Sequence, residues 1–428
     1  RCMAPRWLHR LIDLREEELA PSTMGAVYFF CLMFGYFMLR PLRESMGLEG
    51  GVGRLRLLFL ATLLVMVVVN VGYGWLVANL RRRLFVPLIY RGAIACLLVF
   101  TLLLLSGNEP GGLVGRVFYV WLSVFNLLAV SVFWALMADT FTLEQGKRLF
   151  GFIGVGGTAG AIAGSTFAWT LAERLGPIGL MILAACLIEA AAQIATRLAR
   201  RDPRDRSLAN ERIGGAPWRG LLDVVRNPYL GALGAYVMLY SVLSTLLYFE
   251  KMRIVEANVA GADARTSVFA GIELAGQTLT VLIQLFLTGR LMRWFGVGTL
   301  LAAVPAVTIA GFAALLLAPT LGVLATFEAV RRASNFALSK PARETLFTVV
   351  SRDERYKAKG AIDTFVYRGG DSLGTLADKG AELAALSAGY LAIPIAGVAL
   401  TLSVWLGFRE RARNTQPVDP GVQPATSS

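Results

Sequence analysis

The sequence predicts an all-α membrane protein, with twelve transmembrane helices arranged in two six-helix bundles. Composition is the first reason. Of the 428 residues, 56% are hydrophobic and 17% are charged, whereas soluble domains have about 45–50% apolar and about 25% charged residues. The second reason is that apolar runs such as 55–80 and 297–317 contain the roughly 20 residues that a helix needs to cross about 30 Å of hydrocarbon. A soluble enzyme and a disordered protein are therefore excluded.

Charged residues, glycines and prolines separate the apolar runs and so define the expected helices. The basic turn Arg81–Arg83 separates the second span from the third, and Gly176 with Pro177 separates the fifth from the sixth. The expected spans are 22–42, 56–79, 85–105, 114–138, 150–171, 177–196, 229–249, 266–288, 297–317, 320–338, 361–386 and 388–407.

A hydrophilic stretch rich in arginine and proline divides these spans into two sets of six. The expected parts are a cytoplasmic N-terminal segment at 1–21, an N-terminal bundle at 22–196, a cytoplasmic linker at 197–228, a C-terminal bundle at 229–407 and a cytoplasmic, disordered tail at 408–428.

The distribution of positive charge predicts the orientation. The net charge is +13, and 28 of the 42 lysines and arginines fall in the alternate loops that share a side with both termini, against 9 in the opposite loops. Because positive loops stay in the cytoplasm, we expect a monomeric, multi-pass protein of the cell (inner) membrane with both termini cytoplasmic. The same pattern explains the charge without a nucleic-acid partner.

Residues for catalysis or metal binding are sparse. His9 is the single histidine, and the four cysteines have no metal-ligand spacing, so we expect no enzyme activity, no metal and no cofactor. The glycine run 154–160 continues as Gly156, Gly160 and Gly164. Small residues at steps of four allow close approach of transmembrane helices, so we expect packing here and no dinucleotide site.

Charged residues inside the spans point to a solute site, because each costs at least about 2.5–3.5 kcal/mol at bilayer depth and usually faces a bundle interior. One face of the 361–386 span carries Arg368, Asp371, Thr375, Asp378 and Glu382, and we expect it to look into a wet cavity. Arginines of other spans exceed the nearby carboxylates and favour an anion: Arg40, Arg43, Arg91, Arg331 and Arg332. Two alternatives stay open: internal pairs, Arg40 with Glu44 and Arg331 with Glu328, or arginines that snorkel to the interface.

A basic turn at 81–83 that recurs at 290–293 is the pattern of the major facilitator superfamily. Three segments carry a further resemblance: Leu39–Glu44, Val130–Trp134 followed by Glu144, Lys147 and Arg148, and the pair Lys340–Glu344 and Lys357–Asp363. They resemble the ATP/ADP translocases of plastids and intracellular bacteria, a family related to the major facilitator superfamily. The resemblance implies a nucleotide exchanger built on the facilitator fold.

Some residues that this family uses for nucleotide differ here. A family lysine falls on Arg43, another falls on Asp371 with reversed charge, a family glutamate has no acidic counterpart between Leu122 and Asn126, and another falls near Ser244. The sequence therefore supports transport more strongly than ATP/ADP exchange.

The function expected from the sequence is secondary transport, by alternating access, of an anionic solute such as a nucleotide or phosphorylated metabolite. The alternatives are a proton-coupled carrier and a non-transporting scaffold or sensor with a carrier fold. The candidate substrate-binding residues are Arg40, Arg43, Glu44, Asn126, Glu328, Arg331, Arg332, Asn335, Arg368 and Asp371. The candidate gate residues, with a solvated loop as the alternative, are Lys147, Arg148, Lys340, Arg343, Glu344 and Lys357.

Overall fold

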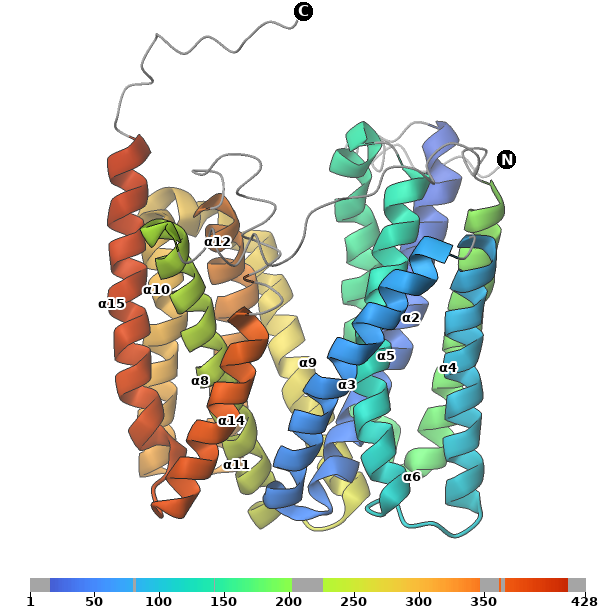
Figure 1. Ribbon diagram of the computed structural model, residues 1–428, viewed down its shortest axis with the longest axis horizontal. Helices are drawn as coiled ribbons and strands as arrows, with labels where there is room; N and C mark the ends of the chain where they lie inside the picture. Colours follow the sequence, from blue (N-terminus) through green and yellow to red (C-terminus); the bar gives the residue numbers. More distant parts are fainter. Residues whose placement is uncertain are drawn as a thin grey trace, which may run out of the picture. The chain divides into compact units, whose positions relative to one another are not determined.

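A computed structural model describes residues 16–79, 82–141, 143–201, 226–346, 362 and 366–414. In these residues the chain is helical and has no strand (Figure 1). The helices are α2 Glu16–Leu48, α3 Gly51–Asn79, α4 Arg82–Leu105, α5 Leu113–Thr140, α6 Leu143–Arg201, α8 Pro228–Asn258, α9 Ala262–Phe286, α10 Thr288–Leu317, α11 Leu321–Ala333, the π-helix η1 Ser334–Ser339, α12 Lys340–Leu346, α14 Tyr367–Leu383 and α15 Ala388–Asn414.

The all-α, multi-pass class is confirmed. Eight of the described helices are long and apolar enough to cross a membrane, and every span expected from the sequence overlaps a described helix. The number of twelve crossings and their grouping into two six-helix bundles stay predictions.

Two glycines mark breaks that the sequence pattern anticipated. Gly176, with φ of 59°, interrupts α6 just before Pro177, between the spans expected at 150–171 and 177–196. Gly296, with φ of 75°, interrupts α10 just before Val297. A positive φ is open to glycine at little steric cost, so each residue redirects the chain where a side chain would be strained.

The helices form two compact units, and each is described by itself. Unit 1 comprises residues 1–213 and 251–278, and unit 2 comprises residues 214–250 and 279–428. The helices α8 and α9 therefore each contribute one part to unit 1 and another to unit 2. The domain boundaries expected from the sequence stay a prediction.

In unit 1, α2 lies against α6 through the glycine stripe. A Cβ added to Gly156, Gly160 or Gly164 would lie 2.2–2.5 Å from a backbone carbonyl oxygen of α2, which is too close for any side chain. The predicted packing role of these glycines is confirmed.

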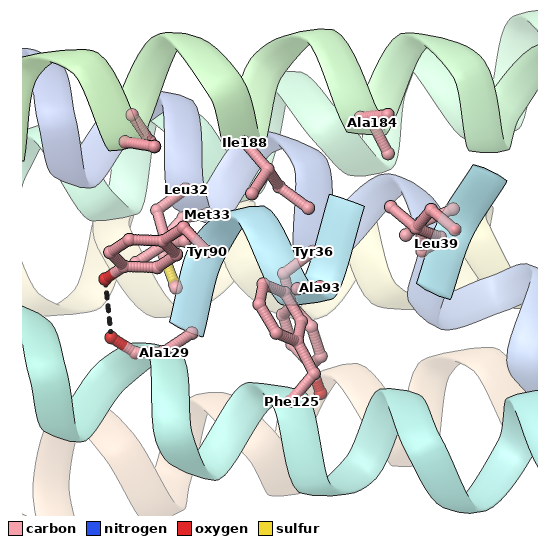
Figure 2. Close-up of a cluster of buried hydrophobic side chains, with 14 of the residues drawn as sticks. Leu32, Met33, Tyr36, Leu39, Tyr90, Ala93, Phe125, Ala129, Ala184 and Ile188 are labelled. Carbon is pink, nitrogen blue, oxygen red and sulfur yellow. Dashed lines mark hydrogen bonds between the residues drawn. The ribbon is translucent and has the colours of Figure 1, made fainter. Parts of the chain in front are cut away.

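The core of unit 1 joins α2 to three neighbouring helices (Figure 2). Tyr90 of α4 donates a hydrogen bond to the Ala129 carbonyl oxygen of α5 at 3.2 Å, and its hydroxyl also meets that of Tyr28. The buried side chains around them include Leu32, Met33, Tyr36, Leu39, Ala93, Phe125, Ala184 and Ile188. The two hydroxyls are thus satisfied inside an apolar cluster, as buried polar groups require.

In unit 2, glycines again set the close contacts. Gly370 and Gly374 bring α14 against α8, where an added Cβ would lie 2.7 Å from the Met238 carbonyl oxygen or the Thr245 side chain. Tyr236 fixes the end of the π-helix, because its hydroxyl bonds the Leu301 carbonyl oxygen and the hydroxyl of Ser339, each at 2.9 Å.

Candidate functional site

Two arginines of α2 are each held by a carboxylate. Arg40 donates to Glu273 of α9 at 2.9 Å, and Arg43 pairs with Glu44. The alternative pairing of Arg40 with Glu44 is therefore wrong. A pattern along one helix cannot reveal a partner on another helix, and Glu273 supplies that partner. The Arg43 side chain is 13% exposed, which argues against an arginine that simply snorkels to the interface, whereas the Arg40 side chain is 27% exposed.

Arg43 has a second set of contacts, on α5. Its guanidinium donates to the Ser123 hydroxyl at 2.7 Å and lies 4.7 Å from the centre of the Tyr119 ring. Tyr119 and Ser123 are four residues apart, so they lie on the same helix face. They hold the guanidinium through a cation–π contact and a hydrogen bond.

A small pocket in unit 1 adjoins these pairs. Two cations and two carboxylates line it, with three apolar residues: Arg40, Lys251, Glu44, Glu273, Pro41, Phe269 and Ile272. Arg91, which the sequence placed among the inward arginines, has a side chain that is 61% exposed and pairs with Glu189 at 3.8 Å. It therefore adds no buried positive charge to this group.

In unit 2, α11 carries two adjacent arginines with different partners. Arg332 pairs with Glu328, one turn earlier, at 3.7 Å. Arg331 is buried, and the expected pair of Arg331 with Glu328 is wrong, because the i, i+4 spacing favours Arg332. Arg331 instead donates to Thr308 at 3.1 Å and to Ser244 at 2.9 Å.

The same guanidinium lies 5.0 Å from the centre of the Tyr240 ring. Its other contact, with the Tyr240 carbonyl oxygen, is long, at 3.5 Å. Tyr240 and Ser244 are four residues apart on α8, so they repeat the arrangement that Tyr119 and Ser123 form around Arg43.

The polar face of α14 lies against α8 and not in an open cavity, which corrects the expectation from the sequence. Asp371, Thr375 and Asp378 are buried, because Gly370 and Gly374 allow the close approach of α8. At the two ends of this face, the side chains of Arg368 and Glu382 are 43% and 49% exposed.

Asp371 is held from two helices. Ser241 donates to its Oδ1 atom at 2.5 Å, and Thr245 adds a longer contact at 3.4 Å. Arg368 of α14 donates to Oδ2 at 3.2 Å. The carboxylate therefore joins α8 to α14 and holds one more arginine.

The remaining candidates are dispersed. Asn335 is buried in η1, and Asn126 is half-buried on α5. Lys340 is exposed beside the Phe336 ring, and Arg343 is half-buried. The backbones of Lys147, Arg148 and Glu344 lie in α6 and α12, whereas their side chains and Lys357 lie outside the described residues.

Five residues around the arginines were not identified from the sequence: Glu273, Tyr119, Ser123, Tyr240 and Thr308. The spacing Tyr-x-x-x-Ser on two apolar helices was the available signal for three of them, and Ser244 was noted only as a position near which a family glutamate falls. In the residues that the structure describes, no group of His, Cys, Asp or Glu could hold a metal ion.

No protein-family model matches the sequence. The chain is 23% identical to ADP,ATP carrier protein 1 of Chlamydia trachomatis, with 92% of this chain and 88% of that protein covered. It is 21% identical to ADP,ATP carrier protein 1 of Chlamydia pneumoniae, over 92% of this chain and 91% of that protein.

Solved transporter structures share the fold. An auto-inhibited POT family peptide transporter superposes with a TM-score of 0.60 and 14% identity, covering 94% of this chain and 98% of its own. A mutant form of the nucleoside transporter NupG gives a TM-score of 0.57 and 15% identity, covering 92% of this chain and 99% of its own.

These proteins are transporters and not enzymes, which confirms the prediction that the chain is not an enzyme. The chain thus shares the fold of solved membrane transporters, and eight of its described helices are long and apolar enough to cross a lipid bilayer. Its resemblance to the ATP/ADP translocases, a family related to the major facilitator superfamily, is confirmed along nearly the whole chain.

Proposed function

We propose that this transporter carries an anionic solute, a nucleotide or a phosphorylated metabolite, by alternating access of two helical bundles. The observation that carries the proposal is a set of four arginine–carboxylate pairs inside the helices. The pairs are Arg40–Glu273, Arg43–Glu44, Arg332–Glu328 and Arg368–Asp371.

Such pairs suit the binding and release of an anion. A carboxylate beside a guanidinium lowers the cost of holding that charge in a low-dielectric interior, where an isolated charge is expensive. A phosphate that enters takes the place of a carboxylate on the same guanidinium fork, and the carboxylate returns when the phosphate leaves. These four guanidinium groups therefore stay paired before and after transport.

The relatives narrow the class of solute. They are named as carriers of ADP and ATP, both of which present several phosphates. A nucleoside transporter is among the structural neighbours, but its substrate is uncharged and would leave the arginines without a role. Phosphate-bearing nucleotides are therefore the first substrates to test.

A counterflow screen tests this proposal. Purified protein is reconstituted in liposomes preloaded with ADP, inorganic phosphate or a sugar phosphate, and uptake of labelled ATP or of the matching solute is followed. We expect accelerated uptake with at least one phosphate-bearing pair. Folded protein that exchanges none of them would contradict the proposal.

One observation favours a second candidate, a non-transporting scaffold or sensor that keeps the carrier fold. Asp371 and Thr375 are buried against α8, as expected for helices that are sealed by internal contacts. Absence of uptake for every solute, with native stability, would favour this candidate. Proton coupling is the remaining alternative, and uptake that depends on a pH gradient and loses this dependence in D371N would support it.

A further inference from the structure

The environment of Arg331 in unit 2 differs from that of the other candidate arginines. Its partners are the hydroxyls of Thr308 and Ser244, the carbonyl oxygen of Tyr240 and the ring of Tyr240. Among the residues that the structure describes, no carboxylate lies within ion-pair distance of it. Arg331, a residue that is 6% exposed, thus has no carboxylate as counter-ion among the described residues.

A comparison with Arg43 shows what is missing. Each guanidinium lies beside a tyrosine ring and donates to the hydroxyl of a serine four residues later in the sequence. The distance to the ring centre is 4.7 Å for Arg43 and 5.0 Å for Arg331, and the distance to the serine hydroxyl is 2.7 Å and 2.9 Å, respectively. Arg43 also has a carboxylate, Glu44. Among the described residues around Arg331, nothing occupies the corresponding role of counter-ion.

The donors of Arg331 are oriented by its partners. The Nε atom donates to the Thr308 hydroxyl, and the Nη2 atom donates to the Ser244 hydroxyl. The Nη1 atom has no hydrogen-bond partner among the described residues, and it is not one of the buried polar atoms left without a partner. It is thus the donor of the guanidinium that the described residues leave for a ligand.

We propose that Arg331 binds the anionic group of the solute and determines the preference for charged over uncharged solutes, with Ser244 and Thr308 as positioning residues. The ligand class is a phosphate group or another compact oxyanion, which accepts charge-assisted hydrogen bonds from guanidinium. The proposal rests on the proposed function for its link to transport. Its chemistry is a binding property that can be measured without transport.

The test uses full-length protein in detergent and follows the shift in thermal midpoint with increasing ADP, inorganic pyrophosphate or adenosine. The variants are R331Q, R331K and R91Q, which serves as the matched control because the Arg91 side chain is 61% exposed and pairs with Glu189. We expect ADP and pyrophosphate, but not adenosine, to stabilise the native protein. R331Q should raise the apparent Kd for both anions at least tenfold.

R331K should recover part of the affinity, because lysine keeps the charge but loses the fork, and R91Q should stay within about threefold of native. S244A and T308A should weaken anion binding severalfold, whereas S244T, which keeps a hydroxyl, should bind the anions as the native protein does. A merely structural role would not produce this pattern. They also provide a test if R331Q does not fold.

Native affinity for ADP and pyrophosphate in R331Q would overturn the proposal, and so would equal losses in R331Q and R91Q or no anion binding by the native protein. Anion binding that depends on Arg331 without counterflow would leave this inference standing and reject the transport proposal. Counterflow that R331Q leaves unchanged would support the transport proposal and reject the role inferred for Arg331.

Discussion

Arg40 of α2 and Glu273 of α9 form an ion pair at 2.9 Å, between residues that lie 233 positions apart in the sequence. Gln277, one turn beyond Glu273, also donates to the same carboxylate oxygen at 3.2 Å. The Arg40 side chain is 27% exposed and that of Glu273 is 8% exposed. The buried carboxylate of Glu273 therefore depends on the pair more than the partly exposed guanidinium of Arg40 does.

We predict that R40Q destabilises the protein more than E273Q does. R40Q leaves a buried carboxylate without its guanidinium, at a cost of about 2–3 kcal/mol, whereas E273Q leaves an arginine that reaches water, at a cost of about 1 kcal/mol. Thermal midpoints in detergent measure both. The charge-swapped R40E/E273R should be more stable than either R40E or E273R, and purely additive losses would show that the pair has no coupling.

The glycine stripe of α6 gives a second prediction. G160A places a Cβ at 2.3 Å from the Phe30 carbonyl oxygen, and forced separation of packed helices costs about 1–3 kcal/mol or more. G154A is the matched control on the same helix, since an added Cβ there meets nothing within 4 Å, and alanine is the better helix former. We expect a lower midpoint for G160A and an unchanged or higher one for G154A; equal effects would mean that α2 does not depend on the stripe.

The tyrosine pair in the core of unit 1 gives a third prediction. Tyr90 donates to the Ala129 carbonyl oxygen (Figure 2) and shares a second hydrogen bond with the Tyr28 hydroxyl. Y90F therefore removes both of these hydrogen bonds, and Y28F removes only the shared one. An unsatisfied buried group costs about 1–3 kcal/mol. The fall in thermal midpoint should therefore be larger for Y90F than for Y28F, and the reverse order would contradict the assignment of two hydrogen bonds to Tyr90.

The contact of α8 with α14 can be tested by thiol labelling. In a background without native cysteines, T375C should resist a water-soluble maleimide, because Thr375 is 2% exposed. E382C, on the same helix, should react, because the Glu382 side chain is 49% exposed. Rapid labelling of T375C would show that this face opens to water, as the sequence alone suggested.

Much of the fold could be predicted from composition and periodicity. Apolar run length identified the spans, because it is a local property, and the breaks at Gly176 and Gly296 fall between the limits of neighbouring expected spans. The packing of Gly160 was predictable for the same reason. The pairing of charges could not be predicted, because the helix period places Arg40 near Glu44 and gives no information about Glu273 on another helix.

The candidate site could likewise be predicted only in part from the sequence. Arg43 and Arg331 were identified as charges inside apolar spans, but their partners depend on tertiary contacts. The face of α14 was recognised as polar, yet burial of Asp371 under α8 depends on Ser241 and two glycines that a single-helix pattern does not combine. Orientation and the convergence of the polar faces on one pore stay predictions.

The central claim is that solute charge decides what is carried. The most direct measurement compares uptake of labelled ATP and labelled adenosine into proteoliposomes preloaded with ADP. The account predicts ADP-stimulated uptake of ATP, with adenosine at the level of protein-free liposomes. Uptake of adenosine without uptake of ATP would contradict it.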